Sequence, residues 1–236
     1  EIGSGLVGSE MCIRDSNYDD YFYKFDGQIK PDSGIVAGDI LKIGNISDRG
    51  FVIDRQLTLM PLDNTSKISN GFIHLVKGSD GSTVSGLTIN NTKGSLSING
   101  IYVSQLHGIW ITKSNNNTIM NNIIRIAYAA GVYAMPMGWS SYNRIIGNDM
   151  STYFTCVMVM GQCHYNLISK NKLETLDYSD EIVSNLIYFN PFGHADYSGP
   201  ALCVGNIISD NYLKAFCNGL MSIVCLLYTS PSPRDR

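Results

Sequence analysis

Four copies of one eight-residue frame, N-x-I-x-x-N-x-[ILM], recur in the second half of the chain and constrain its fold more than any other feature. The copies begin at Asn117, Asn143, Asn166 and Asn206, at successive intervals of 26, 23 and 40 residues. A weaker copy without the asparagines, residues 84–89, precedes them. Repeats of this length are typical of solenoids, in which each unit buries its apolar face against its neighbours.

The residues within the repeats favour strands over helices. The segments are short, rich in Ile, Val, Tyr and Thr, and bounded by Gly and Asn, and they lack sustained i, i+3, i+4 periodicity. A second strand is expected in each unit, at residues 100–103, 131–134 and 156–159. If the coils stack in parallel at about 4.8 Å, one isoleucine of each frame enters a buried column. These isoleucines are Ile119, Ile145, Ile168 and Ile208.

The second asparagine of each frame predicts a structural ladder. Asn tolerates the left-handed backbone of sharp corners, and stacked amides can hydrogen-bond to each other and to the turn backbone. The ladder would contain Asn122, Asn148, Asn171 and Asn211. Exposed asparagines that bind a ligand are the alternative.

The four frames resemble the repeats of right-handed parallel β-helix proteins, the pectate-lyase-like superfamily, and the resemblance extends over residues 35–223. Residues 38–43 and 51–59 are similar to the opening coil of such domains. Residues 78–89 resemble coils in adhesin-like surface proteins of anaerobic archaea. The resemblance implies an all-β, right-handed parallel β-helix solenoid that is secreted or displayed at the cell surface.

Both ends of the chain resemble translated sequencing adapter. Residues 6–16 look like one strand of a transposon-type library adapter, and residues 225–236 look like the other. We therefore expect residues 1–16 and 225–236 to be non-biological. Residues 17–34 would then be an irregular N-terminal stretch, and residues 35–224 a β-helix domain that is truncated at both ends.

Charge and hydropathy argue against two classes of partner. Without the two adapter-like ends, 16 acidic and 14 basic residues remain, and no Lys/Arg cluster supplies the attraction that dominates nucleic-acid binding. No uninterrupted apolar stretch reaches the roughly 18 residues of a membrane helix. We therefore expect an extracellular or surface-attached monomer that binds no nucleic acid and has no membrane span in this part of the chain.

The 40-residue interval from Asn166 to Asn206 predicts two loops, because extra residues in a solenoid leave its wall. With residues 186–189 as the buried strand, the loops are residues 174–185 and 190–201. The first loop opens with Glu174. The loops also contain four carboxylates and a histidine that could serve acid–base catalysis: Asp177, Asp180, Glu181, His194 and Asp196. Tyr178 and Tyr197 beside them could stack on sugars. An ordinary solvated loop is the alternative.

The residue patterns of enzymes in this superfamily are missing. Residues 17–224 contain no Asn-Thr-Asp run and no Gly-His-Gly turn, and the direct pair Asp19-Asp20 precedes any recognisable coil. Lyase-like members bind calcium through acidic residues, for which Asp177, Asp180 and Glu181 could supply oxygen ligands. We expect no cofactor, with calcium only in that lyase alternative. The cysteines form no CxxC pair, so no zinc site is expected.

Trp139 is a further candidate for ligand binding. Pro136 is expected to interrupt the strand, so that Trp139 lies in a turn. Its ring would be either an aromatic platform for a sugar or packed against the solenoid wall.

Cys163 and Cys203 each lie three residues before a frame asparagine. If their coils are neighbours, the two positions approach the Cα separation that a disulfide requires. Buried free thiols are the alternative.

These observations predict a non-catalytic, adhesin-like β-helix module for display or for binding a glycan or another surface. The alternative is a polysaccharide lyase or glycoside hydrolase with its site on the loops of residues 174–201.

Overall fold

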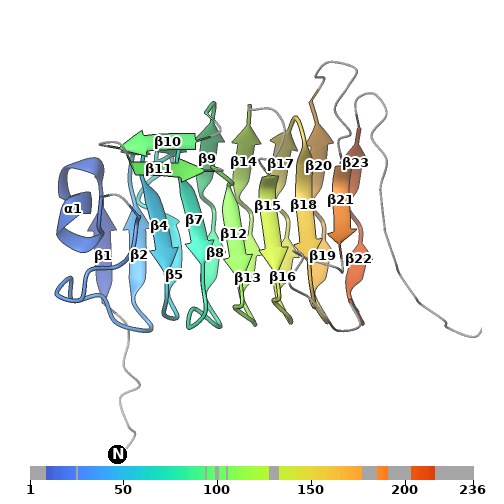
Figure 1. The fold of residues 1–236 in the computed structure, drawn as a ribbon, viewed down its shortest axis with the longest axis horizontal. Coiled ribbons are helices and arrows are strands. Elements are labelled where there is room, and N and C mark those ends of the chain that lie inside the picture. The colour runs from blue at the N-terminus through green and yellow to red at the C-terminus, as the bar shows by residue number, and fades with distance from the viewer. Residues whose placement is uncertain are drawn as a thin grey trace, which may run out of the picture.

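The chain is a solenoid of short strands joined by turns, as the computed structural model in Figure 1 shows. The structure describes residues 9–24, 26–93, 95–98, 101–104, 106–127, 133–176, 185–190 and 203–215. In these ranges the strands form three parallel sheets and one antiparallel hairpin. The predicted parallel β-helix is therefore confirmed.

Each complete coil contributes one strand to each sheet, in the order sheet 1, sheet 2, sheet 3. Sheet 1 contains β1 (Glu10–Ile13), β2 (Ile40–Ile43), β5 (Thr58–Pro61), β8 (Thr83–Ser85), β13 (Thr118–Met120), β16 (Arg144–Ile146), β19 (Leu167–Ser169) and β22 (Ile207–Ser209). Sheet 2 contains β3 (Ile46–Ser47), β6 (Ile68–Ser69), β9 (Thr88–Asn91), β14 (Ile123–Ile126), β17 (Asp149–Thr152), β20 (Lys172–Thr175) and β23 (Tyr212–Lys214). Sheet 3 contains β4 (Gly50–Ile53), β7 (Phe72–Leu75), β12 (Ile109–Thr112), β15 (Tyr133–Gly138), β18 (Thr155–Met160) and β21 (Asn185–Asn190).

The strand registers place equivalent side chains on top of one another. Ile119 pairs with Ile145, Ile145 with Ile168, and Ile168 with Ile208, as the frame predicts. The first three are fully buried, and Ile208 packs against the same core from the last described coil. Burial of each such side chain contributes about 1.5–3 kcal/mol. This column is the centre of the fold.

Left-handed backbone recurs at both corners that flank sheet 1. At each corner, the residue just before the position of a frame asparagine, or before the equivalent position on an earlier coil, has a positive φ. This backbone lets the chain turn sharply at the same place in every coil. At one corner these residues are Gly81, Asn116, Tyr142, Tyr165 and Gly205, and at the other they are Gly86, Asn121, Gly147, Lys170 and Asp210.

A short helical segment covers the first end of the solenoid (Figure 1). It contains the 3-10 helix η1 (Asp15–Asn17) and the helix α1 (Tyr18–Tyr21). The rings of Tyr18 and Phe22 stack at 5.2 Å, and the ring of Phe51 in β4 meets both edge-on. The Tyr18 hydroxyl donates a hydrogen bond to the carbonyl of Gly50. These contacts shield the apolar interior of the first coil, as capping segments of solenoids do.

β1 lies within the segment that resembles adapter. Its four residues pair with β2 in register, and Ile13 is fully buried against the first coil. Glu10 forms an ion pair with Lys42 of β2 at 2.6 Å. β1 therefore adds one strand to sheet 1. The adapter origin of residues 1–16 stays a prediction. No helix in the described part of the chain is long and apolar enough to cross a membrane.

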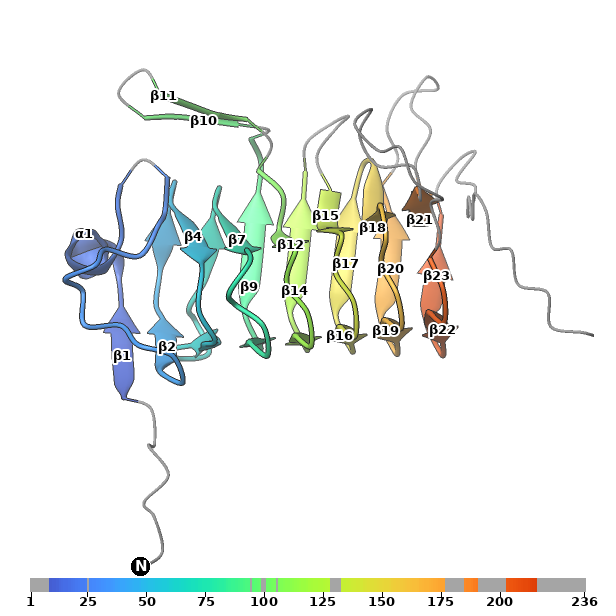
Figure 2. The ribbon, with the colours of Figure 1, turned by 60° about the horizontal axis from the view of Figure 1, so that its bottom comes forward.

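The prediction of a coil strand at residues 100–103 is wrong. β11 (Ile101–Ser104) pairs antiparallel with β10 (Ser95–Ile98), and this hairpin lies apart from the stacked strands (Figure 2). The sheet 3 strand of this coil is β12. Ser82 and Asn117, which occupy the same position on successive coils, are 35 residues apart, so this coil also carries extra residues. They leave the solenoid as the hairpin.

Candidate functional site

The long connections of the chain flank sheet 3. Between sheets 2 and 3 the connections include the β10–β11 hairpin and residues 127–132 and 176–184, and residues 191–206 connect β21 to β22. In contrast, only two residues separate β13 from β14, and likewise β16 from β17 and β19 from β20. Insertions in a solenoid map to loops on one face, which is often the binding face. The outer face of sheet 3 is therefore the candidate site.

Five aromatic side chains form a continuous series along this face, which we call the aromatic file. His74 of β7 stacks on Trp110 of β12, with ring centroids 4.1 Å apart and planes 6° from parallel. His107, which precedes β12, meets Trp110 edge-on at 5.0 Å and Tyr133 at 5.1 Å. Tyr133 opens β15 and lies 5.4 Å from Phe154, in the turn before β18. The file thus crosses four successive coils at the edge where the long connections leave.

Strand alternation directs two of these rings outward. Val52, His74 and Trp110 occupy one register position on β4, β7 and β12. Their neighbours Ile73 and Ile109 are fully buried inside the solenoid, and successive side chains of a strand point to opposite faces. His74 Nε2 lies 3.1 Å from the Thr112 hydroxyl on the same outer face.

The two histidines of the aromatic file are neutral at pH 7. Burial lowers the pKa of His74 to about 4. Burial, and secondarily the proximity of His74, lowers the pKa of His107 to about 3. His107 Nδ1 accepts a hydrogen bond from the backbone N–H of Tyr133 at 3.0 Å, which keeps this nitrogen unprotonated. His74, Trp110, Tyr133 and Phe154 are partly exposed, whereas His107 is buried.

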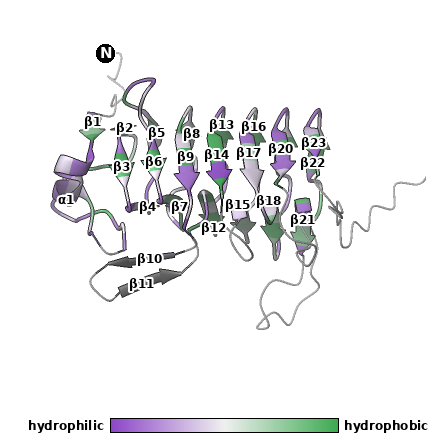
Figure 3. Ribbon diagram, turned by 90° about the horizontal axis from the view of Figure 1, so that it is seen from above, coloured by the Kyte–Doolittle hydropathy of each residue, from purple (hydrophilic) through white to green (hydrophobic). Residues whose placement is uncertain are grey.

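Sheet 3 differs from sheet 2 in charge. Its six described strands contain no Asp, Glu, Lys or Arg. The outer face of sheet 2 carries paired charges: Asp149 binds Arg125 at 3.0 Å and Lys172 at 3.3 Å, and Glu174 binds Lys214 at 2.7 Å. Figure 3 shows the contrast, because β12, β18 and β21 are coloured as mainly hydrophobic and β9 and β20 as mainly hydrophilic.

The loop residues predicted for catalysis or sugar stacking lie outside the described residues. They are Asp177, Tyr178, Asp180, Glu181, His194, Asp196 and Tyr197. The strand expected between the two loops is present as β21, which pairs with β18. Glu174, expected to open the first loop, instead lies within β20 and pairs with Ser151. The predicted roles of these loop residues stay predictions.

Trp139 packs against the solenoid wall. Its indole occupies the space beside Gly161 on the next coil, where a Cβ would lie 2.7 Å from the ring. The expectation that Pro136 interrupts the strand is wrong, because β15 continues through Pro136 to Gly138 and pairs there with β18. Pro136 is tolerated where the ladder toward β12 is short, with only Ile111 and Thr112 in register. Trp139 is thus held by the next coil.

Both asparagines of the frame form ladders, not the second alone. Asn122, Asn148, Asn171 and Asn211 are linked through side-chain amides at 2.9–3.0 Å. The first frame asparagines form a second ladder that sequence reasoning missed, at 2.9–3.1 Å. Its members are Asn117, Asn143, Asn166 and Asn206. Both ladders are largely buried and are occupied by contacts between coils, so they hold the solenoid together.

Cys163 and Cys203 are buried free thiols, so the suggested disulfide is not formed in the structure. Each sulfur has another partner. Cys163 Sγ accepts the backbone N–H of Ser140 at 3.3 Å and donates to the carbonyl of Met160 at 3.2 Å. Cys203 Sγ donates to the carbonyl of Gly161 at 3.1 Å. Burial raises the pKa of the Cys163 thiol to about 12.

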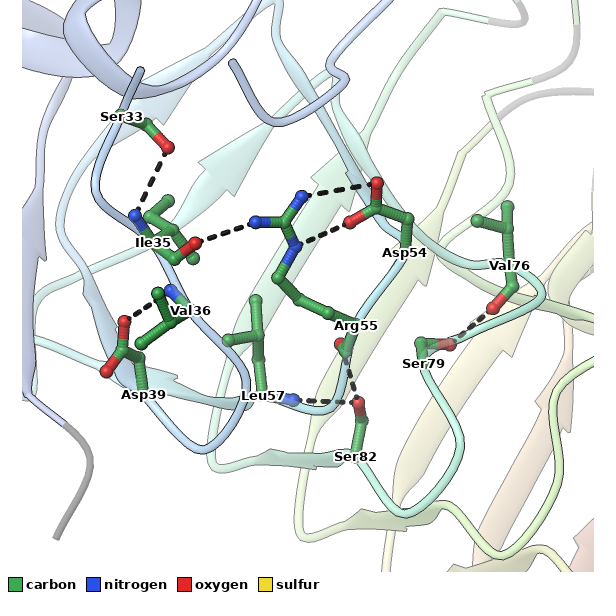
Figure 4. A network of polar contacts seen from close by, with 10 residues as sticks. All are labelled: Ser33, Ile35, Val36, Asp39, Asp54, Arg55, Leu57, Val76, Ser79 and Ser82. Carbon is green, nitrogen blue, oxygen red and sulfur yellow. Dashed lines mark hydrogen bonds and ion pairs between the residues drawn. The ribbon is translucent and has the colours of Figure 1, made fainter. Parts of the chain in front are cut away.

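A polar network on the first coils has a structural role (Figure 4). Arg55 pairs with Asp54 at 2.8 Å and donates to the carbonyl of Ile35 at 2.7 Å. The Ser82 hydroxyl accepts the backbone N–H of Leu57 at 3.0 Å. The network therefore fastens the N-terminal stretch and the turn before β8 to the turn between β4 and β5.

In the described ranges no group of three or more His, Cys, Asp or Glu side chains could hold a metal ion. Comparisons with protein-family models, curated proteins and solved structures found no match.

Proposed function

We propose that this chain is a non-catalytic binding module of a secreted or surface-attached protein, and that it binds a glycan on the outer face of sheet 3. The observation that supports this proposal best is the position of the aromatic file. Its rings lie at the edge of sheet 3 where the long connections leave the solenoid. A rigid wall beneath variable loops is a common arrangement for ligand binding.

The chemistry of the file suits a sugar. Pyranose rings have apolar C–H surfaces and hydroxyl edges, which match aromatic rings that lie beside neutral hydrogen-bonding groups. His74 covers one face of Trp110, so that pair offers mainly its outer edge. Tyr133 and Phe154 are tilted 41° from each other and partly exposed, and they are the rings that we assign to sugar contact. The Thr112 hydroxyl can exchange hydrogen bonds with sugar hydroxyls.

The proposal of a non-catalytic module rests on the described acidic residues. No carboxylate lies on a described strand of sheet 3. Asp149 and Glu174, on the neighbouring sheet 2, are held in ion pairs. Glycosidases place a pair of carboxyl groups on either side of the scissile bond. An enzyme would need the carboxylates of the 174–201 loops, and that alternative stays open.

The test is retardation of the protein in gels that contain single polysaccharides. We expect at least one polysaccharide to retard the chain, and Tyr133→Ala and Phe154→Ala each to weaken the interaction about tenfold, which corresponds to about 1.4 kcal/mol. Tyr142→Ala is the matched control, because Tyr142 is exposed but stacks on Tyr165 at the opposite edge of sheet 3.

Two results would contradict the proposal. Loss of retardation in Tyr142→Ala, but not in Tyr133→Ala, would move the site away from the aromatic file. Release of reducing ends or of unsaturated sugars from the retarding polysaccharide would instead favour the lyase or hydrolase alternative.

A further inference from the structure

We infer that the glycan bound at the aromatic file is uncharged. This inference rests on the proposed function and concerns the class of polymer that sheet 3 accepts. Its first support is the absence of Asp, Glu, Lys and Arg from the six described strands of sheet 3. The two basic side chains of the file, His74 and His107, contact Trp110 and are uncharged at neutral pH.

In the connections between sheets 2 and 3, the described cations Arg49 and Lys93 have other partners: Arg49 stacks on the ring of Tyr18, and Lys93 pairs with Asp48 at 2.9 Å. Outside the hairpin, the other described residues of these connections are 70–71, 92, 106–108, 127, 153–154 and 176. They contain no Asp, Glu, Lys or Arg. Lys113 follows β12 at the opposite edge of the sheet. Among the described residues of these connections, an anionic polymer on the file would therefore meet no cation without another partner.

The lack of charged residues on sheet 3 should make this face selective between neutral and acidic polymers. A uronate or sulfate group leaves water at a large cost unless a cation or several hydrogen-bond donors receive it. Proteins that bind such groups supply Arg or Lys clamps, often bidentate. A neutral sugar carries no such cost and gains from the contact of its C–H surface with Tyr133 and Phe154. The sheet 3 face thus selects neutral polymers and rejects acidic ones.

The experiment compares polymers that share a backbone and differ in charge. The probes are methyl-esterified homogalacturonan against polygalacturonate and desulfated against sulfated galactan, with mannan, xylan and β-glucan as further neutral polymers. Each is cast in native gels at low and at high salt, and retardation of the chain is measured. We expect at least one neutral polymer to bind at least tenfold more tightly than any acidic one, with little salt dependence.

Two variants sharpen the test. Tyr133→Ala should lose binding to the neutral polymer while Tyr142→Ala keeps it, and circular dichroism checks that both are folded. Thr112→Arg adds a cation beside His74 on the outer face. It should raise binding to the acidic partner of a pair at least tenfold at low salt, and this gain cannot come from misfolding.

The outcomes separate the two proposals. If the unmodified chain binds a neutral polymer and the Tyr133 variant does not, the result supports both glycan binding at the file and the preference for uncharged glycans. Salt-sensitive binding to polygalacturonate or sulfated galactan by the unmodified chain overturns the inference and leaves glycan binding standing. If no polymer retards the chain, both are overturned.

Discussion

Asn148 donates a hydrogen bond from its side-chain amide to Oδ1 of Asn171 on the next coil, at 3.0 Å, and its backbone N–H donates to the same oxygen at 2.9 Å. The same amide donates to the carbonyl of Ile119 on the preceding coil at 2.9 Å. In turn, Asn148 Oδ1 accepts from the backbone and the side chain of Asn122. One buried side chain therefore joins three coils.

Asn148→Ala should destabilise the fold strongly. The substitution removes Asn148 Oδ1, which accepts from the buried backbone and side-chain N–H groups of Asn122, and each unsatisfied buried group costs about 1–3 kcal/mol. We expect the free energy of unfolding to fall by about 3 kcal/mol in urea denaturation. Asn116→Gly is the control, because Asn116 is exposed and has a φ of 59°, which glycine adopts freely. Equal losses in the two variants would contradict the structural role of the ladder.

The frame predicts the winding of the chain because its signals repeat at equivalent positions. Isoleucines in register and asparagines at the corners are local features that each coil must supply. Residues 100–103 misled the prediction because Ile, Tyr and Val favour any strand, whether it lies in a coil or in a hairpin. The 35-residue spacing between Ser82 and Asn117 is the signal that could have revealed extra residues there.

The candidate site was much harder to predict than the fold. The rings of the aromatic file come from five positions with no common spacing, so their contacts depend on which coils stack and in what register. The burial of His107 between Trp110 and Tyr133 has no local signature in the sequence. Carboxylates in long loops could be recognised in the sequence as candidates for a site. Outward-facing residues of separate strands form a site only when the coils stack and bring them together.

Gly161→Ala should release Trp139 from the wall. Gly161 has a φ of 69°, and a Cβ there would lie 2.7 Å from the indole of Trp139. Strain and displacement of the ring together should cost about 1–3 kcal/mol. Urea denaturation and a shift of tryptophan emission measure the two effects. Gly138→Ala is the control, because a Cβ at Gly138 meets only the carbonyl of Met160, at 3.9 Å. Equal stability and equal tryptophan emission in the two variants would show that Trp139 does not pack against Gly161.

The thiols of Cys163 and Cys203 should resist alkylation in the folded chain. Both are buried, and burial raises the pKa of each, which leaves very little reactive thiolate at pH 8. Iodoacetamide followed by peptide mapping should label the exposed Cys12 and spare both buried thiols until urea is added. A melting temperature that falls on addition of a reductant, with a mass two hydrogens lower before it, would show instead that the disulfide forms.

The stability of the chain should fall on acidification through the pKa of free histidine. In the fold the pKa of His74 is lowered from 6.5 to about 4, so the unfolded chain binds more protons between these values. The stabilisation that comes from the lowered pKa of His74 is therefore complete above pH 6.5 and is lost progressively as the pH falls toward 4. Each pKa unit corresponds to about 1.4 kcal/mol, and because solvent reaches part of the ring we expect a loss of roughly 2 kcal/mol. Urea denaturation from pH 7.5 to 4.5 measures it. His74→Gln should make the profile less steep in this window, with the remaining slope from His107, whose pKa is also lowered by burial. An equally steep profile in the variant would mean that folding does not lower the pKa of His74.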